Sequence, residues 1–98
     1  MAHITGGGFF DNIPRVLSDD CGAKIHAGAW PIPRVFHWIQ EKGHVQAKEM
    51  YRTFNMGIGM ILVTPAGRAL KVISHLAKFK ERAWIVGEIV KGKGVSIQ

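Results

Sequence analysis

Cys21 is the only cysteine in the chain, so an internal disulfide cannot stabilise the fold. A metal site would need more ligands, and the five histidines show neither HxH nor HExxH spacing. We therefore expect no metal site and a reducing, cytoplasmic setting. No apolar run reaches the roughly 18 residues of a membrane span, and no basic segment followed by an apolar one indicates a signal peptide.

Acidic residues are scarce, because seven Asp and Glu stand against thirteen Lys and Arg, for a net charge of +6. This excess can indicate a nucleic acid, a membrane surface or an anionic small molecule as partner. The basic residues are scattered, with local density only at 78–82 and 91–93. Such short runs are typical of a solvated face, so we expect no membrane partner and do not favour a nucleic acid.

Three consecutive glycines, Gly6–Gly8, separate a short apolar run from an amphipathic segment. This order predicts a strand over Ala2–Thr5, a loop, and a helix that starts near Phe10 or Asp11. Glycine has no Cβ and accepts φ > 0, so a ligand can reach main-chain N–H groups. Beside a helix N-terminus these groups favour an anion such as phosphate, and a purely structural turn is the alternative. The phosphate interpretation requires the three glycine amides to be free.

The rest of the chain follows helical or strand periodicity in turn. It predicts strands over Ala23–Ala29, Met56–Thr64 and Ala83–Val90, and helices over Pro33–Gly43, Gln46–Phe54 and Leu70–Ala77. The resulting order, β-α-β-α-α-β-α-β, predicts an α/β (α+β) fold in which a mixed β-sheet is packed with helices. One domain is expected over residues 1–90, and the glycine-rich, polar residues 91–98 are predicted to form a flexible tail.

Two glycines, Gly57 and Gly59, fall on one face of the strand predicted over Met56–Thr64. Glycine weakens the interior of a strand, so a pair on one face indicates that something approaches closely. Either a helix packs tightly on the sheet there, or a ligand binds. Arg52 and Asn55, at the end of the preceding helix, are polar candidates beside these glycines.

Four blocks stand in order along the chain: His3–Phe9 with Asn12–Leu17, Trp30-Pro31 with Phe36–Gln40, Glu49–Met60, and Ala83–Gly87. Together they resemble the phosphoribosylformylglycinamidine cyclo-ligases, also called aminoimidazole ribonucleotide (AIR) synthetases, over nearly the whole chain. The resemblance implies a ligase of de novo purine synthesis. Such an enzyme uses ATP and Mg²⁺ to close formylglycinamidine ribonucleotide into aminoimidazole ribonucleotide, with release of ADP and phosphate.

The resemblance also implies that the chain is a truncated C-terminal domain. Family members have an N-terminal domain that forms the dimer and supplies most ATP contacts. We therefore expect this chain alone neither to bind ATP or Mg²⁺ tightly nor to catalyse cyclisation. Its expected partners are the ribonucleotide substrate or phosphate, and a second copy or a separately encoded N-terminal half. The latter expectation arises because Ala2–Thr5 would present an unpaired strand edge and apolar surface.

The candidate site combines the glycine loop with the glycine-bearing strand, and no catalytic residue is predicted. Binding of substrate or phosphate is assigned to His3, Thr5, Gly6, Gly7, Gly8, Asn12, Arg15, Asn55, Gly57 and Gly59. Structural or surface roles are the alternatives for His3 and Arg15, and Asp11 is interpreted as a first-turn helix residue rather than a base. The alternative to an enzyme fragment is a stand-alone phosphate- or nucleotide-binding module without catalysis.

Overall fold

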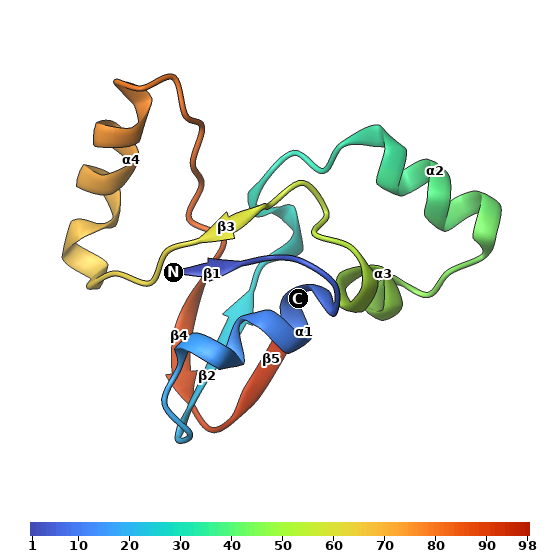
Figure 1. Ribbon diagram of the computed structural model, residues 1–98, viewed down its shortest axis with the longest axis horizontal. Helices are drawn as coiled ribbons and strands as arrows, with labels where there is room; N and C mark the ends of the chain where they lie inside the picture. The colour runs from blue at the N-terminus through green and yellow to red at the C-terminus, as the bar shows by residue number, and fades with distance from the viewer.

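The computed structural model describes residues 1–98 as a mixed α/β fold, which confirms the predicted fold class (Figure 1). Two small sheets replace the single sheet expected, one of order β1-β3 and one of order β4-β2-β5. No helix has the length and apolar character needed to cross a membrane. The strands are β1 (Ala2–His3), β2 (Cys21–Ile25), β3 (Met60–Ile61), β4 (Gly87–Lys91) and β5 (Gly94–Ile97), and the helices are α1 (Gly8–Asn12), α2 (Arg34–Gly43), α3 (Ala47–Thr53) and α4 (Ala69–Ala77).

Three short 3₁₀ turns complete the fold: η1 (Pro14–Val16), η2 (Ala27–Ala29) and η3 (Ala66–Arg68). The three later helices lie where the helical spacing predicts them. The first helix differs, because it begins at Gly8 rather than near Phe10 or Asp11 and ends at Asn12. Pro14 has no N–H to continue the ladder, so a separate turn, η1, follows.

β2 is the central strand of the larger sheet, paired antiparallel with β4 and parallel with β5. Gly22 on β2 pairs with Val90 on one side and with Gly94 on the other. A Cβ at Gly22 would collide with the carbonyl oxygens of Gly92 and Gly94. The connection from β4 to β5 therefore passes against the end of β2, at a position where no side chain fits.

Residues 91–98, predicted to form a flexible tail, contain the strand β5. Gly94–Ile97 form β5, and the pairing continues at Gln98, whose amide donates to the Ile25 carbonyl oxygen at 2.8 Å. The two apolar residues of β5 alternate with exposed neighbours and pack, half-buried, against the core. The segment therefore forms a strand in spite of its polar composition, because its apolar residues alternate and its backbone is hydrogen-bonded to the central strand β2.

The strand predicted over Met56–Thr64 is wrong in all but the two residues of β3. The preceding residues form a tight turn, in which the Ile58 amide donates to the Asn55 carbonyl oxygen at 2.9 Å. Its central residues, Met56 and Gly57, have φ of 52° and 95°. Positive φ at both central residues is typical of a type I′ turn and incompatible with a strand.

Trp30 holds this turn against the core. Its indole Nε1 donates to the Met56 carbonyl oxygen at 3.0 Å. The Trp30 ring packs with Phe9 and Tyr51, with ring centroids 5.8 and 6.4 Å apart. A left-handed conformation costs a residue such as Met56 about 1–2 kcal/mol, and complete burial of its side chain offsets that cost.

Two other strands also differ from their predicted bounds. The strand expected over Ala23–Ala29 is β2, which begins two residues earlier, ends four residues earlier and is followed by η2. The strand expected over Ala83–Val90 begins only at Gly87, because the residues before it have no neighbouring strand. Directly before β4, the Val86 carbonyl oxygen accepts from the amide of His26, the residue that follows β2, at 2.8 Å.

Candidate functional site

The three glycines of the loop between β1 and α1 have different surroundings. Gly8 is buried, and its amide donates to the Thr5 carbonyl oxygen at 2.9 Å. A Cβ at Gly8 would overlap the carbonyl oxygen of Tyr51 on α3 and lie 2.9 Å from that of Arg52. Gly8 therefore permits α1 to pack against α3. Its amide is not free, so the phosphate interpretation is wrong for this glycine.

Gly6 and Gly7 leave the other side of the loop open. Gly6 is exposed, and no atom lies within 4 Å of the position that its Cβ would take. Gly7 is half-buried and has a φ of 91°, a conformation that favours glycine. Neither amide donates a hydrogen bond within the chain. Two adjacent main-chain donors are therefore available to an anion.

Asn12, which we predicted to bind substrate, holds the glycine loop in shape. Its side chain is almost completely buried, and its Nδ2 donates to the carbonyl oxygens of Thr5, Gly6 and Gly8 at 3.2, 3.3 and 2.7 Å. Its Oδ1 accepts from the Thr5 hydroxyl at 3.4 Å. All polar atoms of the side chain are thus engaged within the loop.

His3 lies on β1, and Gly59 directly precedes the neighbouring strand β3. His3 pairs with Met60, and the Ile4 amide donates to the Gly59 carbonyl oxygen at 2.8 Å. His3 and Gly59 are exposed, and no atom lies within 4 Å of a Cβ position at Gly59. Together with Gly57 they line a wide apolar groove, which the glycines of the loop do not line.

The remaining predicted residues have no hydrogen bond to the glycine loop. The Asn55 Oδ1 accepts from the Gly57 amide at 2.8 Å within the type I′ turn. A Cβ at Gly57 would lie 2.6 Å from Pro33 Cδ, so the close approach at this glycine comes from a proline ring rather than from a helix. Arg15 is exposed on η1 and takes part in no ion pair.

Of the two cations near the loop, Lys48 was missed by sequence reasoning, and Arg52 was predicted only as a polar candidate beside the glycine-bearing strand. Both cations lie over the ring of Phe10, the third residue of α1. The distance to the ring centroid is 5.7 Å from Lys48 Nζ and 5.1 Å from Arg52 Cζ. Arg52 also pairs with Glu49 at 3.3 Å. The signal was present as two cations at i and i+4 on one helix, but their aromatic partner lies far away in the sequence.

The buried phenol of Tyr51 makes the free energy of unfolding depend on pH in the alkaline range. Burial raises the pKa of its phenol above the ordinary value of about 10. The folded chain then holds this proton more tightly than the unfolded chain, so stability present below pH ~10 is lost as pH rises further. We expect the free energy of unfolding to fall more steeply above pH ~10 in the parent than in Tyr51→Phe.

The titration of Tyr51 can be followed directly, because it is the only tyrosine in the chain. Phenolate absorbance in the folded protein should rise at a higher pH than in urea-unfolded protein. An equal or lower midpoint in the folded protein would contradict this prediction. The comparison with Tyr51→Phe separates the phenol from the lysines that titrate in the same range.

The whole chain, residues 1–98, matches a family model described as AIR synthase related protein, C-terminal domain. The phosphoribosylformylglycinamidine cyclo-ligase of Thermoanaerobacter sp. (strain X514) is 50% identical over 94 residues, which are 96% of this chain and 28% of that protein. The chloroplastic enzyme of the same name from Arabidopsis thaliana is 50% identical over 98 residues, or 25% of its length. The chain thus spans about a quarter of the length of these relatives.

Proposed function

The chain belongs to the family of AIR synthase related proteins through its match to their C-terminal domain, and we propose that it is part of a phosphoribosylformylglycinamidine cyclo-ligase. The proposed reaction is the ATP-dependent closure of formylglycinamidine ribonucleotide to aminoimidazole ribonucleotide. The proposal is carried by 50% identity across 96% of the chain to a protein of that name. The same resemblance rests on four separate blocks of the sequence, so it does not depend on the glycine loop alone.

In this proposal the glycine loop binds a phosphate group of the ribonucleotide. The free amides of Gly6 and Gly7 donate to its oxygens, and Asn12 keeps the loop in the required conformation. Lys48 and Arg52 lie over the ring of Phe10 on α1, and they add positive charge near this helix, which the Glu49 carboxylate paired with Arg52 partly offsets. Their role is electrostatic attraction and orientation of the anion rather than proton transfer.

The residues of this chain do not fit a Mg²⁺ site. No group of three or more His, Cys, Asp and Glu side chains lies close enough to hold a metal ion. The resemblance implies that ATP supplies the phosphoryl group that activates the formyl oxygen. We assign both ATP and Mg²⁺ to the part of the enzyme that lies outside this chain, and we place no catalytic step on the residues described above.

The second candidate is a stand-alone module that binds phosphate or a nucleotide without catalysis. It is favoured by the two free amides at Gly6 and Gly7, which need no other domain to be available. Binding of ribose 5-phosphate to the isolated chain without turnover of any nucleotide would favour this module. A nucleic-acid partner is less consistent with the scattered arrangement of the basic residues.

The test compares the isolated chain with a chimera, in which this chain replaces the 94 matched residues of the Thermoanaerobacter relative. With ATP, Mg²⁺ and formylglycinamidine ribonucleotide, we expect the chimera to release ADP and the isolated chain to release none above the rate without protein. The unmodified relative is the positive control. A folded chimera that forms no ADP would contradict the proposed function, and turnover by the chain alone would contradict the assignment of ATP to the other part.

A further inference from the structure

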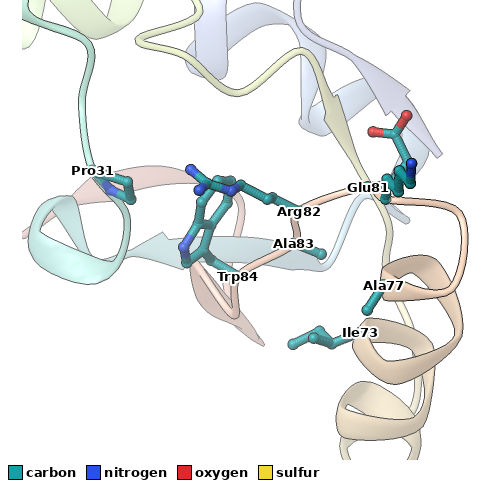
Figure 2. Close-up of a pocket in the computed structure, with 8 residues that line it drawn as sticks. Pro31, Ile73, Ala77, Glu81, Arg82, Ala83 and Trp84 are labelled. Atoms are coloured by element: carbon teal, nitrogen blue, oxygen red, sulfur yellow. The ribbon is translucent and has the colours of Figure 1, made fainter.

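One face of the helix α4 is apolar and is turned toward the rest of the chain. Its residues Val72, Ile73 and Leu76 line the wide apolar groove next to β3. Figure 2 shows a smaller hollow of about 520 Å³ beside this groove, where Ile73 and Ala77 face the segment that carries Trp84. Figure 1 shows α4 at one edge of the molecule, away from the other three helices. The second face of α4 is therefore turned toward solvent.

The second face of α4 carries a basic stripe, which consists of Arg68, Lys71, His75 and Lys78. These residues follow one another at intervals of three, four and three positions, so their side chains are neighbours on one side of the helix. All four are exposed, and none lines the groove or the hollow. The stripe extends over about 15 Å, at 1.5 Å per helical residue. It is thus a surface separate from the groove.

No acidic residue of the chain neutralises the basic stripe. The single ion pair of the structure joins Arg52 to Glu49 on α3. No Asp or Glu occurs between Glu49 and Glu81, so the stripe has no acidic neighbour along the helix. None of its side chains donates a hydrogen bond within the chain. The positive charge of the stripe is therefore available to an anionic partner.

The stability of α4 does not account for the N-terminal half of the basic stripe. Arg68 is the N-cap residue of α4, Lys71 lies in its first turn, and this turn contains no acidic residue. Cations at the N-terminal end of a helix oppose its dipole, and like charges three or four residues apart repel each other. Arg68 and Lys71 therefore reduce the stability of the helix. A pattern that conflicts with local stability is typical of a functional surface.

We infer that the basic stripe is the docking surface for an acidic helix of a separate protein. A helix with Asp or Glu three and four residues apart repeats the spacing of the stripe, so each cation meets one carboxylate. Phe79 is 67% exposed, and its ring packs against that of His75 with centroids 5.4 Å apart. This ring adds an apolar contact beside the charges. The inference goes beyond the proposed function and does not rest on it.

Other occupants fit the basic stripe less well. A second copy of this chain offers no acidic partner surface, because none of its helices carries more than one Asp or Glu. Affinity for nucleic acid depends on the number of phosphates that cations neutralise, and the stripe offers only three permanent positive charges. A helix that lies on a membrane inserts its apolar face, and that face of α4 is turned toward the rest of the chain.

The test measures binding of a fluorescein-labelled helical peptide by fluorescence anisotropy. Its glutamates lie three and four residues apart on one side, and a control peptide of the same composition distributes them around the helix. We expect the first peptide to bind at least tenfold more tightly than the second. Arg68→Glu/Lys71→Glu should weaken its binding at least tenfold, and Lys91→Glu/Lys93→Glu, an equal change of charge at two exposed lysines outside the stripe, by less than twofold. Equal affinities of the two peptides, or equal losses in the two variants, would overturn the proposal.

Two further measurements separate docking from stability and from other anions. Arg68→Glu/Lys71→Glu should raise the urea midpoint of unfolding, because it places acidic residues at the positive end of the helix dipole and removes repulsion within the stripe. A lower midpoint would mean that the cations stabilise the fold, and would overturn the proposal. The parent and this variant are also titrated with single-stranded RNA and with vesicles of phosphatidylcholine and phosphatidylglycerol. Tighter binding of either than of the acidic peptide, with a loss in the variant, would likewise overturn it.

Discussion

The Gly8→Ala variant is expected to lose about 2–5 kcal/mol of its free energy of unfolding. Two costs combine at this position. Gly8 has a φ of 57°, where a side chain costs about 1–2 kcal/mol. The added methyl group would also overlap the backbone carbonyl of Tyr51, so that α1 must move away from α3 at a further cost of about 1–3 kcal/mol.

This loss is large for a domain of 98 residues, whose total stability is of order 5–15 kcal/mol. Urea unfolding followed by tryptophan fluorescence measures it. Gly6→Ala is the matched control, because no atom lies within 4 Å of its Cβ position and its φ is not positive, and it should change stability by less than about 0.5 kcal/mol. Equal stabilities of the two variants would contradict the close approach of α1 and α3.

The Gly7→Ala variant separates the cost of a positive φ from the cost of steric overlap with a neighbouring backbone. Its φ of 91° penalises a side chain, but its Cβ would meet only the side chain of Asp11, which is exposed and able to rotate away. Gly7→Ala should therefore fall between the other two variants. The sequence shows three equivalent glycines, whereas the structure gives the third a packing role and the first two a free main-chain surface.

Local periodicity was sufficient to predict the elements that pack with one face against the core. Ala2 and Ile4 are buried while His3 and Thr5 are exposed, as in a strand with one buried face, although β1 covers only the first two residues of the strand predicted over Ala2–Thr5. The helix α2 also lies between Pro33 and Gly43, where its apolar spacing predicts it, and its residues Phe36 and Ile39 pack, half-buried, against the core. In these segments the residues that give the pattern are also those that contact the core.

The predictions were wrong in segments whose conformation depends on a contact with residues far away in the sequence. The type I′ turn at Met56 and Gly57 depends on Trp30 and Pro33, which lie well before it in the sequence. The strand β5 depends on pairing with β2, so its short alternation gives little signal by itself. Neither of these contacts can be predicted from the periodicity of a single sequence.

The candidate site shows the same division. The glycine loop was recognised because three glycines in a row are a local signal. Lys48 was missed because its place beside Phe10 depends on how α3 packs against α1. Asn12 was placed in the site, but its hydrogen bonds to three carbonyl oxygens follow from the loop conformation, which the sequence does not specify.

The Asn12→Ala variant is expected to lose about 2 kcal/mol of stability, since the two N–H groups of its buried amide are shared among three carbonyl oxygens and each N–H contributes roughly 1 kcal/mol. Urea unfolding again measures the loss. Asn55→Ala is the control, because it removes one exposed hydrogen bond and should cost about 1 kcal/mol or less. Similar losses in the two variants would contradict the structural role of Asn12.

The Asn12→Asp variant distinguishes hydrogen bonding from packing, because the two side chains have nearly the same shape. At neutral pH a carboxylate would face the three carbonyl oxygens without a proton to donate, so the loss should exceed that of Asn12→Ala. Protonation restores one donor, and the buried carboxyl then has a pKa raised above that in the unfolded chain. The stability deficit relative to the parent should therefore shrink as pH falls and grow as pH rises. A deficit independent of pH would mean that Asn12 stabilises the loop by its shape alone.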